Sequence, residues 1–302
     1  MSSSLVNAEP RRLGSNGPEI GALGYGTWRL TGGDVAANQA LVETALDAGM
    51  NLIDTADVYG LDHGGTGFGQ NEERLGEVLA AAPGLRDRMV LATKGGIMPP
   101  IPYDSSAEYL RSAVDASLSR LKVESIDLWQ VHRPDMFTHP AEIGGVLGEL
   151  HRQGKIAMVG VSNFTPSQHD ALAAHLPMPI VSTQPEYSAA TLDPLRDGTF
   201  DLAMRSGLVP LAWSPLGGGR LLTGEGLRPE LLDVIDKLAA REGVDRATVA
   251  IAFVLAHPSR PVALLGTQTP DRLTGASAAF GVQLDRTDLY EIVVASEGVP
   301  LP

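Results

Sequence analysis

The chain has 302 residues, of which 43% are hydrophobic and 20% charged, and its formal net charge is −13 at pH 7. Because an acidic surface repels phosphate backbones and anionic lipids, this charge argues against nucleic acids and membrane surfaces as partners. The sequence contains no cysteine, which excludes disulfides, thiolate nucleophiles and cysteine-based metal sites.

The start of the chain predicts a tail followed by a hairpin. Residues 1–10 contain no apolar core of signal-peptide length, and we expect a flexible tail there. The segment RRLGSNGPEIG at 11–21 predicts two short strands joined by a turn at Ser15-Asn16-Gly17, which could plug the floor of a barrel. No apolar run along the chain approaches the ~18 residues of a membrane span, so we expect a soluble, cytoplasmic protein.

Strand-like and helix-like segments alternate along the rest of the chain. Eight short runs rich in apolar and β-branched residues predict buried strands at 22–28, 51–56, 89–94, 126–132, 156–163, 179–184, 208–215 and 261–268. Amphipathic stretches predict helices at 34–48, 71–81, 105–121, 140–153, 166–175, 191–206, 229–257 (as two helices), 270–279 and 285–296.

This alternation predicts an α/β fold. Strands that are each followed by a helix form a parallel sheet, and eight is the number of strands that closes into a barrel. We therefore predict a single (β/α)8 TIM barrel over residues 1–302, with the N-terminal β-hairpin preceding its first strand. A doubly wound open sheet is the alternative, but it needs a reversal of strand order, and eight regular units favour closure.

Capping residues support the predicted helices. Asn71, followed by two glutamates, is predicted to cap the helix that starts there. Thr165 and Thr269 each precede a proline, which is typical of an N-cap followed by the first helical residue. Gly49 and Gly154 stand just past two predicted helices, where a left-handed residue often ends a helix.

Ionisable side chains follow the second, third and fourth predicted strands. The reacting groups of an α/β barrel come from the carboxyl ends of its strands and the loops after them. Asp54 and Tyr59 follow the second strand, Lys94 ends the third and His132 ends the fourth. Because closure of the barrel brings these ends side by side, we expect the four side chains to lie close together.

These four residue types suit the delivery of a proton to an oxygen that gains negative charge. A tyrosine has an ordinary pKa of about 10, and a nearby ammonium such as that of Lys94 lowers it. Asp54 can keep a buried Lys94 charged, and the imidazole of His132 can orient a carbonyl oxygen. Hydride addition to a carbonyl creates such an oxygen, and the hydride must come from a cofactor.

Each of the four residues, taken alone, has a structural alternative. Asp54 could cap a loop, Tyr59 could be a packing ring, Lys94 could be a solvated loop residue, and His132 could be a satisfied core histidine. Their occurrence at consecutive strand ends favours chemistry over these alternatives. The other six histidines show no metal-ligand spacing, and we predict no metal site.

Three features could serve an anionic cofactor. The glycines at 217–219 could let backbone amides approach a pyrophosphate next to Arg220, although a lone glycine run is more often a flexible loop. The predicted helix start at Thr269-Pro270 offers amides to an anion, and Trp213 could stack on a flat ring or pack the barrel. No strand is followed by GxGxxG, so a dinucleotide would not bind in the Rossmann manner.

The chain resembles the aldo-keto reductase superfamily over about residues 20–300. The segments that carry the resemblance are GYGTWRL, HRPD, GVSNFTP and AWSPLGGGRL, and they look closest to a bacterial NADPH-dependent branch. The resemblance implies a (β/α)8 barrel with an N-terminal hairpin, an extended NADP(H) cofactor and no metal. It also implies that Asp54, Tyr59, Lys94 and His132 form the catalytic tetrad of the family.

The resemblance further implies cofactor contacts at the strand ends. In the family these segments bind the carboxamide, stack under the nicotinamide, hold the pyrophosphate and contact the 2′-phosphate. Gly26, Thr27 and Trp28 match the first-strand segment, in which the threonine touches the cofactor and the tryptophan lines the substrate pocket. Ser162, Asn163 and Gln184 match the carboxamide contacts, and Trp213 matches the ring that stacks under the nicotinamide. The pyrophosphate loop is matched by Ser214, Leu216, Gly217 and Arg220. The last segment is matched by Gly266, Thr267, Gln268 and Arg272, of which Thr267 and Arg272 match contacts to the 2′-phosphate.

The chain departs from the family pattern at several positions. Some relatives have lysine in place of Gly266, and many have glutamate and asparagine in place of Gly275 and Ala276, where they contact adenine. A preference for NADP(H) therefore rests mainly on Arg272, and use of NADH stays open. The segment after Ala279 is short, so we expect an open pocket and broad specificity.

The resemblance implies an NADP(H)-dependent enzyme that reduces the carbonyl group of a small aldehyde or ketone to an alcohol. We expect Trp28 and the loop residues Met136 and Phe137 to shape the substrate pocket. A cofactor-sensing regulatory subunit on the same barrel is one alternative. An isomerase or aldolase that uses Lys94 as a Schiff-base nucleophile is another, but pairing with Asp54 would keep that amine charged and poorly nucleophilic. We expect a monomer.

Overall fold

Eight short parallel strands close into a barrel in the computed structural model, which describes residues 4–301. The strands are β3 (Leu23–Gly26), β4 (Leu52–Asp54), β5 (Val90–Gly95), β6 (Ile126–Val131), β7 (Ile156–Ser162), β8 (Ile180–Gln184), β9 (Val209–Ala212) and β10 (Val262–Leu265). Since β10 pairs with both β9 and β3, the barrel has no open edge. The predicted barrel is confirmed, and the doubly wound alternative is excluded.

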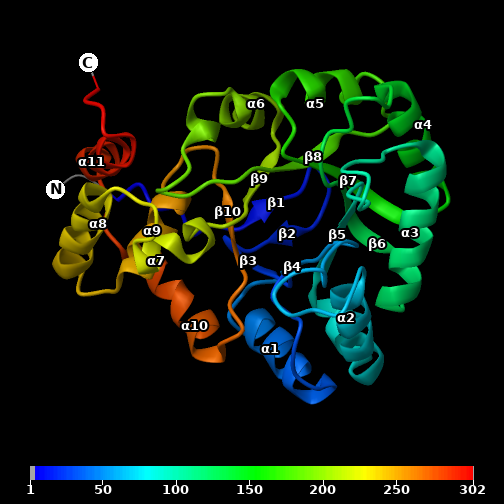
Figure 1. Cartoon of the computed structure of the whole chain (residues 1–302), viewed down its shortest axis with the longest axis horizontal. Coiled ribbons are helices and arrows are strands. Elements are labelled where there is room, and N and C mark those ends of the chain that lie inside the picture. The colour runs from blue at the N-terminus through cyan, green and yellow to red at the C-terminus, as the bar shows by residue number, and fades with distance from the viewer. Residues whose placement is uncertain (1–3, 302) are drawn as a thin grey trace.

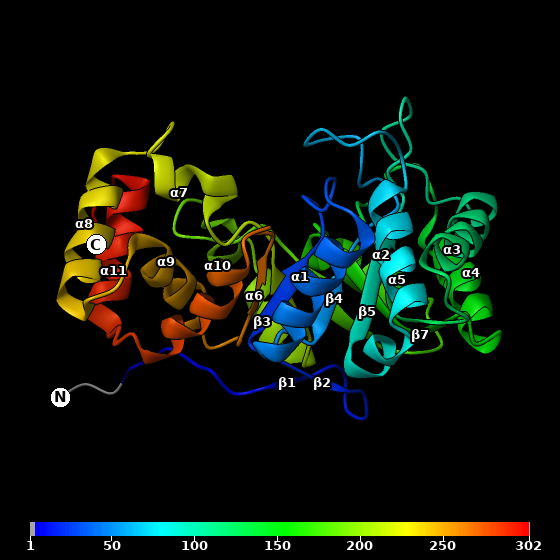
Figure 2. The same cartoon turned by 90° about the horizontal axis from the view of Figure 1, so that it is seen from below.

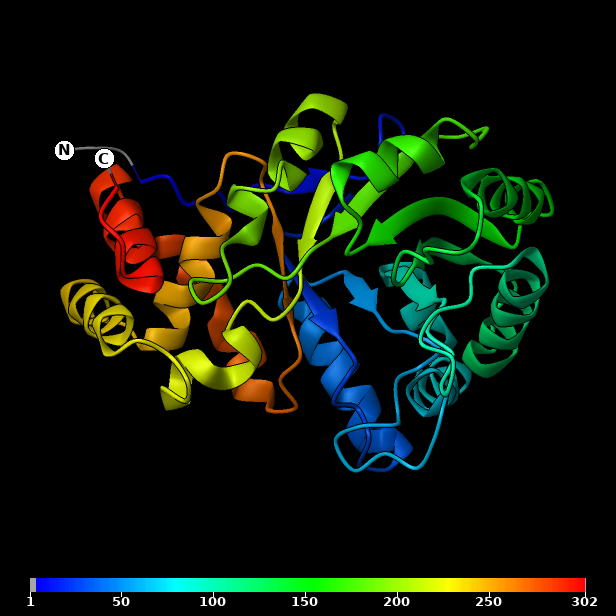
Figure 3. The same ribbon diagram turned by 45° about the horizontal axis from the view of Figure 1, so that its top comes forward.

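Helices alternate with the strands and surround the barrel (Figures 1 and 3). They are α1 (Val35–Asp47), α2 (Gln70–Ala81), α3 (Ala107–Leu121), α4 (Pro140–Arg152), α5 (Pro166–Ala173), α6 (Thr199–Ser206), α7 (Arg220–Thr223), α8 (Pro229–Glu242), α9 (Arg246–Leu255), α10 (Pro270–Gly275) and α11 (Arg286–Glu297). The short α7 and the 3-10 segment η1 (Pro83–Arg88) were not predicted. No helix among residues 4–301 is long and apolar enough to cross a membrane.

Two predicted helices are shorter than expected because the backbone changes conformation inside them. The segment 191–206 divides into η2 (Asp193–Leu195) and α6, separated by Gly198, which has a left-handed φ of 86°. The segment 270–279 begins as α10 and tightens into the 3-10 segment η4 (Ala276–Gly281). An α-helical periodicity does not distinguish these tighter turns from an α-helix.

The capping predictions hold at Thr165 but fail at Asn71. Thr165 forms a capping box with Gln168, as the Thr-Pro sequence predicted. The helix α2 instead begins after Gly69, and the Asn71 side chain donates hydrogen bonds to the carbonyls of Thr27 (2.6 Å) and Trp28 (3.1 Å). Asn71 therefore fixes the end of β3 to α2 and does not cap the helix.

The N-terminal hairpin closes one end of the barrel. Its strands β1 (Arg11–Arg12) and β2 (Glu19–Ile20) pair antiparallel and lie below the barrel in Figure 2. The buried side chains of Leu13 and Ile20 belong to the same apolar cluster as the inward-facing residues of the barrel. The predicted hairpin is confirmed, and it seals the floor because these two side chains fill the space that the strands enclose.

The segment before the hairpin runs along the outside of the fold. Residues 1–3 of the expected flexible tail lie outside the described residues. Leu5 donates its backbone N–H to the carbonyl of Leu284, and Asn7 donates to that of Leu255. These hydrogen bonds hold residues 4–10 against the helices, and the flexibility of this segment stays a prediction.

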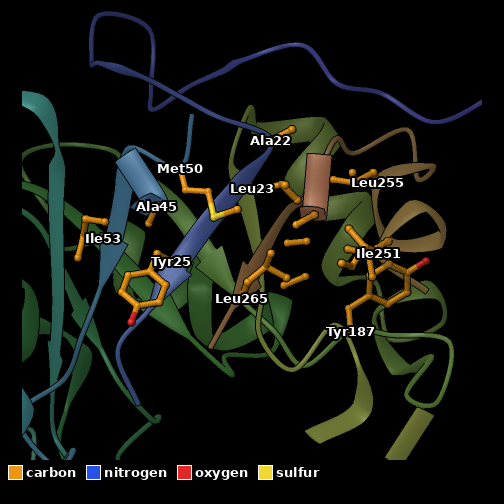
Figure 4. Close-up of a cluster of buried hydrophobic side chains, with 14 of the residues drawn as sticks. Ala22, Leu23, Tyr25, Ala45, Met50, Ile53, Tyr187, Ile251, Leu255 and Leu265 are labelled. Carbon is orange, nitrogen blue, oxygen red and sulfur yellow. The ribbon is translucent and has the colours of Figure 1, made fainter. Parts of the chain in front are cut away.

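Buried hydrophobic side chains fill the layer between the strands and the helices (Figure 4). Tyr25 of β3 and Ile53 of β4 lie on one side of this layer, in the same cluster as Ala45 of α1. Leu265 of β10 lies on the other side, with Ile251 of α9. Close packing of this layer keeps the strand ends in fixed relative positions, which a reaction site needs.

The inside of the barrel changes from apolar to polar along its axis. Near the hairpin, Leu52 and Leu128 are fully buried and pack in the apolar floor cluster. Two residues later on the same strands stand Asp54 and Gln130, which are also buried. The carboxyl-terminal rim of the barrel therefore holds a buried polar layer, and buried polar groups require specific partners.

Candidate active site

Four side chains that follow neighbouring strands meet at the polar rim of the barrel. The ammonium nitrogen of Lys94 lies 2.6 Å from Oδ2 of Asp54, to which it donates, and 2.7 Å from the carbonyl oxygen of Thr55. The same nitrogen lies 4.9 Å from the centroid of the Tyr59 ring. The Tyr59 ring stands edge-on to that of His132 at a centroid separation of 5.9 Å. The structure thus brings together the four residues that strand-end position singled out.

Burial and charge act in opposite directions on Tyr59. Burial has the larger effect and raises the pKa of the phenol, whereas the ammonium of Lys94 lowers it. The predicted lowering by Lys94 is therefore present, but the removal of the phenol from water outweighs it, and the net direction of the pKa shift is upward. A phenol with a raised pKa keeps its proton at neutral pH and can act as an acid.

The two basic groups beside Tyr59 differ in charge, since Lys94 is protonated and His132 is neutral. Burial by itself lowers the pKa of Lys94, but Asp54 and Tyr59 raise it above its ordinary value, so the amine stays charged. Burial lowers the pKa of His132 far below its usual range, and the nearby cations Lys94 and Arg133 act in the same direction. His132 is therefore a neutral imidazole, and a charged Lys94 does not suit Schiff-base chemistry.

The second oxygen of Asp54 accepts two amide hydrogen bonds. Oδ1 receives Nε2 of Gln130 at 3.2 Å and Nε2 of Gln184 at 3.0 Å. Sequence reasoning assigned Gln184 to the cofactor carboxamide and did not single out Gln130. A polar residue at an inward position of the apolar run IDLWQVH was the signal that could have identified Gln130.

Trp213 and the expected carboxamide-binding residues form one hydrogen-bonded group. Trp213 donates from Nε1 to Oδ1 of Asn163 at 3.0 Å, and Asn163 donates from Nδ2 to Ser162 Oγ at 2.8 Å. Ser162 in turn donates to the backbone carbonyl of Gln184 at 3.0 Å. Asn163 and Ser214 have left-handed φ angles of 59° and 50°, which is uncommon for residues other than glycine. Strained residues of this kind concentrate at binding sites.

The expected pyrophosphate loop follows β9 and contacts a basic residue that sequence reasoning missed. The glycines at 217–219 all have left-handed φ angles, and Leu216 packs against the core beside them. Arg220 donates to the carbonyl of Gly217, and Arg29 lies within 3.4 Å of the carbonyl of Gly218. A Cβ built on Gly266 would lie 3.7 Å from Arg29 Nη1. Arg29 therefore lies between this loop and the position where some relatives have lysine.

The remaining expected cofactor residues lie at the ends of β3 and β10. Gly26 pairs with Asp54 on the adjacent strand β4, and the hydroxyl of Thr27 is buried without a partner among the described residues. Thr267 accepts a hydrogen bond from the amide of Thr269. Gln268 lies within 3.2 Å of the hydroxyl of Tyr25, and Arg272 stands exposed on α10. These residues form a rim that runs from the tetrad to α10.

The family model described as "Aldo/keto reductase family" matches residues 22–297. The chain belongs to the aldo/keto reductase family. A 6-dehydroglucose reductase of Novosphingobium aromaticivorans is 48% identical over 97% of both chains. A 6-dehydroglucose reductase of Agrobacterium fabrum is 34% identical over 93% of this chain and 95% of its own. A solved structure of a glycerol dehydrogenase from Gluconobacter oxydans is 29% identical, with a TM-score of 0.83 over 97% of each chain.

The reductase is thus an oxidoreductase of a family that uses nicotinamide cofactors. Aromatic rings and one cation lie close to the tetrad residues. Trp28 meets the ring of His63 edge-on at 4.5 Å and lies 6.3 Å from the ring of Tyr59. The Arg133 guanidinium carbon lies 5.9 Å from the centroid of the Trp213 ring. In contrast, Phe137 is 96% exposed and Met136 is 73% exposed, so both of these expected pocket residues face solvent.

A second group of buried ionisable residues separates β5 from α2 and α3. The hydroxyl of Tyr109 donates to Oδ2 of Asp57 at 3.0 Å, and Glu72 pairs with Arg120 at 2.7 Å. Burial raises the pKa of Asp57 to about 8, and the negative charge of Glu72 adds to this rise. Hydrogen bonding by Tyr109 and the charge of Arg120 act against it. Asp57 was not predicted from the sequence, because it lies between Asp54 and Tyr59 and only those two residues were assigned to the tetrad.

The raised pKa of Asp57 predicts that the reductase loses stability as pH rises from 4 to 8. In this window the unfolded chain releases the Asp57 proton while the folded protein retains it, so folding becomes less favourable by up to about 1.4 kcal/mol per pH unit. Asp57→Asn removes this titration and leaves an oxygen that accepts from Tyr109. We expect chemical denaturation to show that the variant gains stability over the parent as pH rises. Parallel stability curves for the two proteins from pH 4 to 8 would contradict the prediction.

Among residues 4–301, no group of three histidine, aspartate or glutamate side chains is arranged to hold a metal ion. The acidic residues of the site are instead paired with cations or amides of the protein. Asp54 is satisfied by Lys94, Gln130 and Gln184, and Glu72 is paired with Arg120.

Proposed function

We propose that the reductase uses NADP(H) to reduce a sugar aldehyde to the primary alcohol, with Tyr59 as the general acid. The observation that carries this proposal is the half-buried phenol of Tyr59 beside the ammonium of Lys94, which is paired with Asp54 at 2.6 Å. The substrate class comes from the two relatives named 6-dehydroglucose reductase, one of them 48% identical along nearly the whole chain.

The proposed roles follow from the charge state of each group. When bound, a nicotinamide cofactor would supply the hydride that the carbonyl carbon accepts. As the carbonyl oxygen gains negative charge, the hydroxyl of Tyr59 gives it a proton, and the charged amine of Lys94 stabilises the phenolate left behind. The neutral ring of His132, which stands edge-on to Tyr59, orients the carbonyl oxygen by hydrogen bonding. Solvent then returns the proton to Tyr59.

The rim described above fits a nicotinamide dinucleotide. The hydroxyl of Thr27 is buried and has no hydrogen-bond partner among residues 4–301, so a ligand can satisfy it. Ser162, Asn163 and Gln184 would hold the carboxamide, and Trp213 would stack on the ring. In this proposal the glycine loop with Arg220 and Arg29 holds the pyrophosphate, and Arg272 with Thr267 contacts the 2′-phosphate.

The test of the function is cofactor consumption by the purified protein. We expect oxidation of NADPH in the presence of 6-dehydroglucose, measured as loss of absorbance at the nicotinamide band, and slower turnover of simple ketones. Binding of NADPH without consumption on any aldehyde, ketone or quinone would contradict the enzyme proposal and favour the cofactor-sensing subunit. Trapping of a substrate on the protein by borohydride would favour the Schiff-base alternative.

The proposed cofactor preference predicts a selective defect in Arg272→Ala. Loss of one charge-assisted contact to the 2′-phosphate should raise KM for NADPH by roughly 10-fold to 100-fold. KM for NADH should stay within about twofold, since NADH has no 2′-phosphate. Arg286→Ala, which removes an exposed arginine on α11, is the matched control and should change neither value. Equal effects of Arg272→Ala on both cofactors would remove Arg272 from the proposed contact.

A further inference from the structure

The Asp54 carboxylate is held from three sides inside the barrel. Lys94 binds Oδ2, while Gln130 and Gln184 both donate to Oδ1. Asp54, Gln130 and Gln184 stand on β4, β6 and β8, which are alternate strands of the barrel. Side chains from alternate strands share one interior layer, so this contact links three strands at the same depth.

The two amides that share Oδ1 differ in their surroundings. Gln184 ends β8 beside Ser162 and Asn163, and both of these residues donate hydrogen bonds to its backbone carbonyl. Gln184 belongs to the group proposed to bind the cofactor carboxamide, so its side chain would contact the cofactor as well as Asp54. Gln130 is fully buried as the penultimate residue of β6, and Asp54 is the one hydrogen-bond partner found for its side chain among the described residues.

The barrel provides room for Gln130 by means of Gly160 on the neighbouring strand β7. Gln130 pairs with Gly160 in the β6–β7 register. A Cβ built on Gly160 would lie 3.0 Å from Gln130 Cγ and would also meet the Ser182 hydroxyl. Any side chain at position 160 would therefore displace the amide that reaches Asp54. An apolar side chain at position 160 could fill this interior without any hydrogen bond. The glycine instead leaves room for the polar side chain of Gln130, which indicates that the polar layer is a specific feature of the barrel.

We propose that Gln130 is a positioning residue of the reductase, which holds the Asp54 carboxylate against Lys94 while the Gln184 side chain serves the cofactor amide. The inference rests on the proposed function of Tyr59 and Lys94. Gln130 touches no reacting atom and acts through the chain of contacts from Asp54 to Lys94 to Tyr59. Without it, the carboxylate can turn away from Lys94, and the charge that stabilises the Tyr59 phenolate is less firmly held.

The first test is Gln130→Met, which keeps the length of the side chain and removes the donor. We expect kcat for carbonyl reduction to fall about 10-fold, the effect of losing one hydrogen bond to a charged group, with the dissociation constant for NADPH within twofold. In alcohol oxidation, which needs the Tyr59 phenolate, the rise of kcat with pH should move to higher pH. The matched variant Gln184→Met should instead weaken NADPH binding, as measured by quenching of tryptophan fluorescence.

A second variant distinguishes positioning from packing. Gln130→Glu places a carboxyl of the same shape beside Asp54. While protonated at low pH, this group can donate to Oδ1 and should restore kcat above that of Gln130→Met. When ionised at high pH it repels Asp54, and kcat should fall below that of Gln130→Met. A packing role predicts the same relative activity at every pH, and this result would overturn the inference.

A structural measurement decides the inference independently of turnover. In a crystal structure of Gln130→Met with NADPH bound, we expect the Asp54 carboxylate to leave the 2.6 Å contact with Lys94 that the parent shows. Retention of that contact in the variant would overturn the positioning role of Gln130. If the parent protein reduces no carbonyl, the proposed function fails. The distance between Asp54 and Lys94 in the structure of the variant still tests whether Gln130 positions the carboxylate.

Discussion

Tyr59→Phe is expected to lower kcat for carbonyl reduction by about 10³-fold, within the range found for removal of a general acid. The change removes one oxygen atom and leaves the ring that packs beside His132 and Trp28. Because the phenol keeps its proton at neutral pH, this oxygen is the group able to protonate a substrate oxygen next to Lys94. Rapid mixing under single-turnover conditions measures the chemical step directly.

The same variant should still bind NADPH, since none of the proposed cofactor contacts comes from the hydroxyl of Tyr59. Quenching of tryptophan fluorescence by NADPH should therefore give an unchanged dissociation constant. Tyr290→Phe, which alters a half-exposed tyrosine on α11, is the control and should retain full activity. If Tyr59→Phe kept more than a tenth of the parent rate, another group would have to supply the proton.

The fold could be predicted from the sequence because its main signal is local. Each apolar run marks a strand, each amphipathic stretch marks a helix, and eight repeats of the pair are sufficient to indicate a closed barrel. The tetrad was accessible for the same reason, since Asp54, Lys94 and His132 stand at the ends of consecutive strands that closure must bring together.

The contacts within the site could not be predicted, because they join atoms across the barrel. The sequence shows that Gln184 ends a strand, but it does not show that its amide reaches Asp54 on the far side. It shows Asn71 at a helix start, but the side chain binds the carbonyls after β3 and leaves the helix uncapped. The net rise in the pKa of Tyr59 likewise depends on burial, which local patterns do not reveal.

Lys94→Met is expected to destabilise the folded protein by about 3–5 kcal/mol at pH 7, the range found when one partner of a buried ion pair is removed. The amine of Lys94 is fully buried, and its pairing with Asp54 keeps it charged. The variant leaves the Asp54 carboxylate in the barrel with two amide donors but no cation. Urea denaturation followed by circular dichroism measures the loss, and carbonyl reduction should fall at least as far as in Tyr59→Phe.

The double variant Lys94→Met/Asp54→Asn separates the contribution of this ion pair to stability from its contribution to chemistry. With both charges removed, no unpaired ion remains, and neutral replacements of a buried pair are often as stable as the pair itself. We therefore expect the double variant to recover most of the stability that Lys94→Met loses, while activity stays absent because nothing stabilises the Tyr59 phenolate. Recovery of both properties would mean that the charge of Lys94 is dispensable for proton transfer. If neither stability nor activity recovered, the charged pair itself would be required for a stable barrel. That requirement would explain why the protein buries two ions despite the free energy that their desolvation costs.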